Sequence, residues 1–383
     1  MNPLRILHIG ADNSPGGVAG YINAIADNLG AGRCEFHATV TSSSGQRFLS
    51  SRLQLHEFTG HYSLSSLWAR ISALRRLVLT VKPDLVHLHT ARSGFLGMLA
   101  CAGMPIPIVY SGHSWRFEQK SRSVDRAVFR LLERHISLTA DFVTFLTARD
   151  RDFGLSQGLV RADRSVAINT RITAPCTAGV IERRFGDQAE LVASTPTVVN
   201  VGTLNARKNP LLFLDVAAKV LRQRRDVRFL WLGDGDLMAT VKAEAARLGI
   251  DQSVHFPGSR SREEVDAELA AASVLLFTST FEGVPLAILE AKLSGLPVVA
   301  GRYPGVDAVV HHGVDGLLFG LHEAELGAQH ILNLLQRQDF QREFAEAGLQ
   351  FALAEHSDPR IMAEQFADVY ERLTHQKRDV EKR

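Results

Sequence analysis

Short apolar runs alternate with longer segments of helical periodicity along nearly the whole chain, and this alternation constrains the fold more than any other feature. Parallel strands need long crossover connections, usually helices, so the pattern is typical of parallel sheets covered by helices. The chain has 383 residues, which is more than one hydrophobic core usually supports. Two α/β domains are therefore expected.

The predicted strands fall into two groups, separated by a stretch at residues 171–196 where Pro, Gly and charged residues interrupt any regular period. The first group contains Leu4–Gly10, Phe36–Thr41, Leu53–Phe58, Leu85–His89, Ile108–Gly112, Phe142–Thr147 and Val166–Asn169, with helices such as Val18–Leu29, Leu67–Val81 and Val124–Ser137 between them. The second group contains Thr197–Gly202, Arg228–Gly233, Val254–Pro257, Val274–Thr278, Pro297–Gly301 and Leu317–Phe319. Open parallel sheets bind ligands at the carboxyl ends of their strands, so we predict two doubly wound, Rossmann-like domains facing a cleft.

The domain bounds follow from these two groups. Residues 1–180 are predicted to form the N-terminal domain and residues 196–358 the C-terminal domain. An amphipathic helix at 359–375 is expected to pack back on the first domain. The charged segment 376–383 is expected to be a disordered tail.

Composition excludes several classes of protein. No apolar run approaches the roughly 18 to 20 residues of a membrane-spanning helix, and the N-terminus carries no signal-peptide cleavage pattern. Cys34, Cys101 and Cys176 are scattered, without a Cys-x-x-Cys or a His pair at metal spacing, so structural zinc is not expected. A reducing cytoplasm fits this cysteine usage best.

The most informative stretch runs from Thr278 to Ala291, followed by Ser294 to Ala300. It is predicted to be a strand, a Gly-containing turn, a helix opened by Pro285 and another strand. Proline suits a first helical turn, where its missing N–H would have had no partner. The free N–H groups of that turn and the helix dipole favour a phosphate. Glu282 precedes the helix and Glu290 lies inside it.

This stretch resembles the Glu-x7-Glu motif of the family 4 retaining glycosyltransferases, Glu-Gly-x-Pro-Leu-x-x-Leu-Glu-Ala followed by Gly-x-Pro-Val-Val. The resemblance implies the GT-B fold of two Rossmann-like domains. It implies that Glu282 contacts the donor sugar and stabilises its developing charge, and that Glu290 binds the ribose hydroxyls. Val284, Pro285 and Leu286, at the helix start, are expected to bind the donor.

The resemblance continues in the first domain. Pro15-Gly16-Gly17-Val18 is similar to the Gly-Gly loop of the family, in which Gly16 and Gly17 would let the backbone approach the donor. His113 lies where the family has a histidine loop that reaches the transferred sugar. His87 and His89 lie within a strand and are interpreted as core or strand-end residues.

In the second domain, Gly202 to Pro210 resembles the Gly-Arg-Leu-x-x-x-Lys turn whose two cations hold the donor diphosphate. Lys208 matches, but Thr203 replaces the arginine. Arg207 either reaches the phosphates instead or faces solvent. Gly233 lies in Leu232-Gly233-Asp234-Gly235-Asp236, which we interpret as a tight turn near the nucleotide rather than a metal-binding Asp-x-Asp. Ser259, in a segment that flanks the donor base in the family, completes the predicted donor site.

The first half of the chain is net positive and the second half is net negative. A basic helix in the first half suggests an anionic partner for the first domain. Arg122, Arg126, Arg130 and Arg134 recur every four residues beside apolar Val128, Phe129, Leu131 and Leu132. The stripe is either a solvated face over a core helix or a contact with anionic lipid at the inner face of the membrane, which we favour. Nucleic acid is not expected, because no stacking platform accompanies the basic residues.

The resemblance implies a retaining glycosyltransferase that needs no metal and no other cofactor. Its donor would be a nucleotide-diphosphate sugar, by family preference a UDP-sugar. Its acceptor would be a glycan or lipid-linked glycan in bacterial surface-polysaccharide synthesis. Two alternatives stay open. One is a nucleotide-sugar epimerase, which the complete Glu-x7-Glu segment disfavours, and the other is a catalytically weak nucleotide-sugar-binding partner, which Thr203 suggests.

Overall fold

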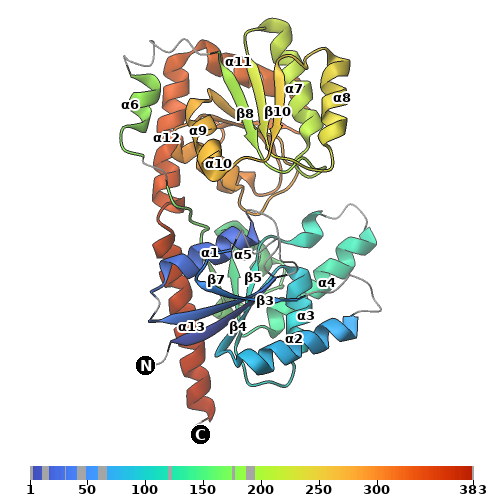
Figure 1. The fold of residues 1–383 in the computed structure, drawn as a ribbon, viewed down its shortest axis with the longest axis vertical. Helices are drawn as coiled ribbons and strands as arrows, with labels where there is room; N and C mark the ends of the chain where they lie inside the picture. The colour runs from blue at the N-terminus through green and yellow to red at the C-terminus, as the bar shows by residue number, and fades with distance from the viewer. Residues whose placement is uncertain are drawn as a thin grey trace. The chain divides into compact units, whose positions relative to one another are not determined.

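The computed structural model of the chain describes residues 3–10, 17–30, 32–40, 49–58, 67–119, 123–174, 177–186 and 195–381. The chain divides into two compact units (Figure 1). The first unit contains Met1–Ile172 and Asp358–Arg383, and the second contains Thr173–Ser357. Both units are parallel α/β structures, as the alternation of strands and helices predicts.

The first unit is built on a seven-stranded parallel sheet in the order β3-β2-β1-β4-β5-β6-β7. Its strands are β1 (Leu4–Ile9), β2 (Cys34–Val40), β3 (Leu53–Glu57), β4 (Leu85–His89), β5 (Ile108–Gly112), β6 (Phe142–Phe145) and β7 (Ser165–Ala167). Its helices are α1 (Val18–Asn28), α2 (Leu67–Val81), α3 (Ala91–Cys101), α4 (Ser123–Thr139), α5 (Ala148–Ser156) and α13 (Pro359–Glu381). The strand order reverses between β1 and β4, and this switch point is where such sheets bind ligands.

The two faces of this first sheet differ in chemistry. Figure 1 shows α2, α3 and α4 together on one side, where Leu7, Val86 and Tyr110 contribute to an apolar core. Because side chains alternate along a strand, His8 and His87 point to the opposite face. The ring of Phe366 from α13 lies 5.4 Å from the His87 ring on that face. A row of buried polar side chains therefore lies under α13.

The second unit contains a six-stranded parallel sheet in the order β10-β9-β8-β11-β12-β13. Its strands are β8 (Thr197–Val201), β9 (Arg228–Leu232), β10 (Val254–Gly258), β11 (Val274–Phe277), β12 (Val298–Arg302) and β13 (Leu317–Gly320). Its helices are α6 (Val180–Phe185), α7 (Pro210–Gln223), α8 (Met238–Leu248), α9 (Arg262–Ala271), α10 (Leu286–Leu293), α11 (Ala324–Gln336) and α12 (Gln338–His356). The switch point lies between β8 and β11, and the seven-plus-six strand prediction is confirmed.

The junction between the units differs from the sequence prediction. The division falls after Ile172, so residues 173–180 belong to the second unit rather than to the first. The reason is α6, which is too short for a periodic signal. Its Ile181 packs against Ala345 and Leu349 of α12, and Arg184 donates a hydrogen bond of 2.8 Å to the carbonyl of Leu269.

The C-terminal helix packs on the first unit, as predicted, but it is longer than predicted. α13 packs on α1, and Glu371 forms a 2.9 Å ion pair with Arg33 beside the start of β2. The helix continues to Glu381, through most of the segment predicted to be a disordered tail.

None of the helices in the described ranges is both long and apolar enough to cross a bilayer.

Candidate active site

Two loops at the switch point of the second sheet carry the predicted donor site. One follows β8 and contains Lys208, and the other follows β11 and contains Glu282. The loops are tied together, because the carbonyl of Arg207 accepts a 2.8 Å hydrogen bond from the Thr280 N–H. The hydroxyl of Thr278 also donates to the Lys208 carbonyl at 3.0 Å. These bonds fix the loops in one arrangement.

Glu282 is the centre of a charge cluster formed by these loops. One carboxylate oxygen lies 2.7 Å from Lys208 Nζ, and the other accepts a 3.1 Å hydrogen bond from Arg207. The side chains of Glu282 and Lys208 are 8% and 14% exposed, so water weakens their attraction little. Lys208 Nζ also lies 5.2 Å from the Phe277 ring centroid, a favourable cation–π distance. The fold thus brings the predicted catalytic acid and phosphate cation into direct contact.

Arg207 supplies a second cation to the cluster. Its guanidinium bonds Glu282 while half of the side chain stays exposed to solvent. Thr203, which replaces the family arginine, is exposed in the same loop. The charge missing at position 203 is therefore present four residues later, on the side chain that pairs with Glu282.

Glu290 lies on α10, with an ion pair that the sequence analysis missed. Its carboxylate contacts Arg262 at the start of α9, and Arg262 also contacts Asp266 at 2.7 Å. The sequence did contain a signal for the position of Arg262. Ser261 and Glu264 have the spacing of a capping box, which the structure shows, and this places Arg262 in the first turn of α9. Glu290 is only 12% exposed, so any ligand that binds its carboxylate competes with Arg262.

Pro285 differs slightly from its predicted position. It is the N-cap of α10, and the helix begins at Leu286, not at the proline. Its carbonyl accepts a 3.0 Å hydrogen bond from Ile288, which starts the helical pattern. The first-turn N–H groups near Val284 and Leu286 are the ones that an α-helix leaves without intrahelical partners. The N-terminus of α10 therefore lies where the motif places it, and its binding of an anion stays a prediction.

Gly233 sits in a turn that only glycine fits. Its φ is +146°, and a Cβ atom there would lie 2.1 Å from the Gly202 carbonyl oxygen. That oxygen accepts a 2.7 Å hydrogen bond from the Trp231 indole, so it cannot move away easily. The Gly233 N–H donates to the Gly258 carbonyl at 3.0 Å, next to exposed Ser259. The structure thus places Gly233 beside the turn that carries Ser259.

Gly233→Ala is expected to lower the free energy of unfolding by roughly 2 to 4 kcal/mol, because the methyl group forces two backbone segments apart. Urea unfolding followed by fluorescence measures this change. Gly20→Ala is the matched control, since a Cβ atom at Gly20 meets nothing within 4 Å and alanine favours the α1 helix. Equal stability of the two variants would contradict the steric account.

In the first unit, Gly17 is the N-cap of α1, with φ +59° and ψ −125°. Its carbonyl accepts a 3.1 Å hydrogen bond from the Tyr21 N–H, and the residue is exposed. Gly17 therefore needs glycine's conformational freedom for its backbone, and its approach to a ligand stays a prediction. Gly16 lies outside the described residues.

His113 follows β5 and is joined to two other histidines. Its Nε2 lies 3.1 Å from Nδ1 of His89, and Nε2 of His89 lies 2.9 Å from Nδ1 of His8. His87 is bonded separately, to the Tyr370 and Ser111 hydroxyls at 2.7 Å each. His87 and His89 are fully buried, as predicted for core residues. The link from His89 to His113 was not predicted.

The histidine cluster resembles a metal site in composition but is hydrogen-bonded in detail. Ligand atoms of His8, His87 and His89 lie within 4.8 Å of one another, the one such group found in the described part of the chain. Both nitrogens of His87 and both of His89 already have hydrogen-bond partners. A metal ion would have to break these bonds, so the geometry favours a hydrogen-bond network.

The basic helix α4 carries an exposed apolar face that the sequence analysis placed only in part. Val124, Val128 and Leu131 are 72%, 57% and 68% exposed, at helical spacing that puts them on one side. Phe129 and Leu132 instead pack on the core, so the predicted apolar stripe is split. The predicted arginines that fall in the described part of α4, Arg126, Arg130 and Arg134, are exposed, and Arg122 lies outside it.

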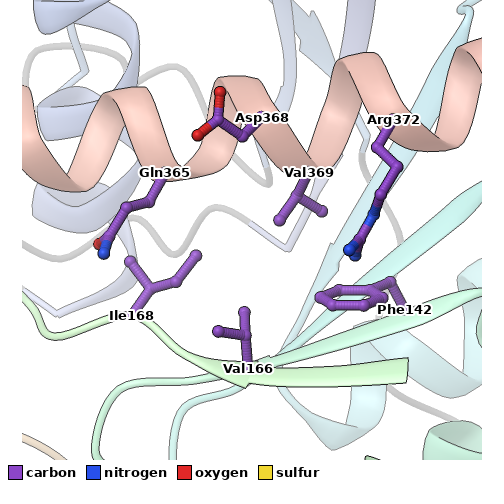
Figure 2. Close-up of a pocket in the computed structure, with 7 residues that line it drawn as sticks. All are labelled: Phe142, Val166, Ile168, Gln365, Asp368, Val369 and Arg372. Atoms are coloured by element: carbon purple, nitrogen blue, oxygen red, sulfur yellow. The ribbon is translucent and has the colours of Figure 1, made fainter. Parts of the chain in front are cut away.

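A pocket in the first unit contains none of the predicted site residues. Figure 2 shows it between α13 and the strands β6 and β7. It is lined by Phe142, Val166, Ile168, Gln365, Asp368, Val369 and Arg372. The Arg372 guanidinium lies 4.5 Å from the Phe142 ring centroid and covers one wall. The predicted residues Lys208 and Glu282 lie instead in the second unit, at the switch point between β8 and β11.

Comparison with known proteins matches both units to glycosyltransferases. Residues 15–170 match the model of Glycosyltransferase Family 4, and residues 183–351 match that of Glycosyl transferases group 1. A UDP-Gal:alpha-D-GlcNAc-diphosphoundecaprenol alpha-1,3-galactosyltransferase from Escherichia coli is 28% identical over 66% of this chain and 66% of its own length. An alpha-D-kanosaminyltransferase from Streptomyces kanamyceticus is 23% identical over 83% of this chain and 86% of its own.

A solved structure shares the whole fold. The crystal structure of Anabaena Alr3699/HepE in complex with UDP-glucose has a TM-score of 0.79 and 21% sequence identity. The match covers 96% of this chain and 99% of that one. With a matching family model on each unit and this two-sheet architecture, the chain belongs to the family 4-like glycosyltransferases of the GT-B fold.

Proposed function

We propose that the protein is a retaining, metal-independent transferase that moves a sugar from a UDP-sugar to a lipid-linked glycan in bacterial surface-polysaccharide synthesis. The observation that carries the proposal is the cluster of Glu282, Lys208 and Arg207 at the switch point of the second sheet. It places two cations and one buried carboxylate beside a helix N-terminus. A leaving diphosphate and a sugar that becomes positive need this combination of charges.

The proposed reaction uses these charges without a protein nucleophile. The bond between the sugar C1 and the diphosphate oxygen breaks, and the electron pair leaves with the diphosphate. Lys208, Arg207 and the N-terminus of α10 stabilise that negative charge. Glu282 stabilises the oxocarbenium-like sugar. The acceptor hydroxyl attacks C1 from the same face, and its proton passes to the departing phosphate oxygen.

Donor binding would rearrange the ion pairs of the cluster. Lys208 and Arg207 both contact Glu282 in the structure, and the donor phosphates would compete for these cations. Glu290 would exchange Arg262 for the ribose hydroxyls. The arrangement of Arg207 supports an active transferase over a weak nucleotide-sugar-binding partner, since the loop carries a second cation despite Thr203.

The lipid-linked acceptor is supported by two separate observations. The relative from Escherichia coli is named for an acceptor carried on diphosphoundecaprenol. Helix α4 exposes Val124, Val128 and Leu131 next to Arg126 and Arg130, which suits an interfacial helix on anionic lipid. We therefore propose that α4 contacts the membrane surface.

Leu131→Glu is expected to weaken binding to vesicles containing anionic lipid roughly tenfold or more, because one apolar anchor is lost and a repelled charge is gained. Co-sedimentation with phosphatidylglycerol vesicles measures the binding. Leu211→Glu is the control, since Leu211 is 47% exposed on α7 in the other unit. Equal binding by both variants would show that α4 does not contact the membrane surface.

The proposed function is tested by supplying donors and acceptors together. The purified protein is incubated with a panel of nucleotide-sugars and a bacterial lipid extract, with EDTA present, and released nucleoside diphosphate is measured. Release that depends on one UDP-sugar and on lipid would support the proposal. Conversion of a donor to its epimer without release would instead establish the epimerase. Nucleotide binding without either reaction would establish the binding partner.

A further inference from the structure

Three histidines form a hydrogen-bonded line across the switch point of the first sheet. His8 comes from β1, His89 ends β4, and His113 follows β5. The contacts run from His8 Nδ1 to His89 Nε2 at 2.9 Å, and from His89 Nδ1 to His113 Nε2 at 3.1 Å. His8 and His89 are fully buried, while His113 is partly exposed. The line therefore leads from the core to a ring that a ligand can reach.

All three rings are neutral at physiological pH. Burial lowers the pKa of His8 to about 3 and that of His113 to about 4. Burial also lowers the pKa of His89 far below its usual range. A neutral imidazole carries one N–H and one acceptor nitrogen. Each ring in the line must therefore donate from one nitrogen and accept at the other.

This requirement leaves two directions for the whole line. In the outward direction, His8 donates to His89, His89 donates to His113, and His113 keeps its proton on Nδ1. In the inward direction, His113 donates through Nε2, His89 donates to His8, and His8 keeps its proton on Nε2. The tautomer of the partly exposed His113 ring is thus fixed by the buried end of the line.

The buried end favours the outward direction. Nε2 of His8 has no hydrogen-bond partner among the residues that the structure describes. The inward direction would leave a buried N–H without an acceptor there, whereas the outward direction leaves only an unused acceptor. Among backbone groups, a buried N–H without a partner is rarer than an under-satisfied acceptor, and we apply the same preference to the imidazole nitrogens. The Tyr21 and His113 rings also pack edge to face, with their centroids 5.0 Å apart, which helps to hold the His113 ring in place.

We propose that His8 and His89 are positioning residues that hold His113 in the Nδ1–H tautomer, so that it presents a hydrogen-bond donor to an oxygen of the transferred sugar. The role of the sugar as ligand rests on the proposed function. His113 then binds an acceptor atom such as a sugar hydroxyl oxygen, and it does not remove a proton from the acceptor substrate. His89 transmits the constraint, because it is the ring that contacts both of the others.

The tautomer is measured directly by NMR on protein labelled with 15N at histidine, through long-range couplings between ring protons and nitrogens. The wild-type protein is expected to show a protonated Nδ1 and an unprotonated Nε2 at His113. A protonated Nε2 would overturn the proposal, whether or not the protein is an active transferase. This arm needs no variant, so a folding failure cannot hide the result.

The kinetic arm compares two substitutions of His89 that differ in hydrogen bonding. His89→Asn keeps an amide N–H that can donate to His113, and it should retain at least a third of the wild-type kcat. His89→Leu removes the donor, and it should lower kcat at least tenfold and release the fixed tautomer in the NMR spectrum. His37→Leu is the control, since it breaks a similar 2.9 Å contact to His56 outside the line.

Each outcome bears on the proposal. Equal loss in His89→Asn and His89→Leu, or equal loss in His37→Leu, would show a merely structural role and overturn it. Failure of the wild-type protein to release nucleoside diphosphate would refute the proposed function while leaving the tautomer result to stand alone.

Discussion

Glu282→Gln is expected to lower kcat roughly 100- to 1,000-fold, which is the usual effect of removing one preorganised charge from a transition-state site. The amide would keep the size of the side chain but could not stabilise a positive sugar. It would also leave Lys208 without its 2.7 Å counter-charge. Steady-state release of nucleoside diphosphate, with donor and acceptor saturating, measures the effect.

The control for this variant is Glu343→Gln, an exposed acid on α12 in the same unit. It is expected to keep the wild-type rate. Thermal unfolding of both variants checks that the fold is intact. If the Glu282→Gln protein is folded and keeps more than a third of the wild-type kcat, Glu282 does not stabilise the transition state.

Lys208→Met is expected to weaken donor binding roughly 10- to 150-fold, because charged hydrogen bonds contribute about 1.5 to 3 kcal/mol. The methionine keeps an unbranched apolar side chain of similar length, but it loses the cationic Nζ that lies 5.2 Å from the Phe277 ring centroid. Arg207 stays beside Glu282, so the buried carboxylate is not left without a cation. Isothermal titration with UDP measures the change in Kd.

Lys242→Met provides the matched control, since Lys242 is exposed on α8. Its Kd for UDP should equal that of the wild-type protein. If Lys208→Met binds UDP as tightly as this control, the lysine does not hold the diphosphate, and Arg207 or the α10 N-terminus would carry that role alone.

Much of the fold was predictable because parallel strands buried on both faces leave a strong sequence signal. β4 and β11, for instance, are continuous buried runs between helical segments. The errors lie where such a signal is missing. α6 has six residues, too few for a period, and the polar end of α13 looks like a solvated tail in sequence. The conformation of both segments depends on packing against neighbouring helices: α6 packs on α12, and α13 packs on α1.

Sequence patterns named the residues of the predicted donor site, whose role stays a prediction, but they did not show the contact between these residues. The Glu-x7-Glu segment and the turn with Lys208 were each recognised from a local sequence pattern. Their contact joins residues 74 positions apart and depends on the reversal of strand order between β8 and β11. Sequence alone could not give that reversal, nor could it show that Arg207 turns toward Glu282.

The histidine line was missed for a similar reason. His87 and His89 lie two residues apart on one strand, a spacing that puts both side chains on the same face. Their partners are set by the pairing of β4 with β1 and β5, and His8 lies 81 positions away from His89. The signal that could have found the line was a histidine in each of two strands and at the end of a third, all in the first unit.

The stereochemistry of transfer tests the central claim most directly. The product formed from an α-linked UDP-sugar, with EDTA present throughout, is analysed by proton NMR for its anomeric coupling constant. The account predicts an α-linked product, formed at an unchanged rate when divalent metal is removed. A β-linked product, or loss of activity in EDTA that added metal restores, would contradict it.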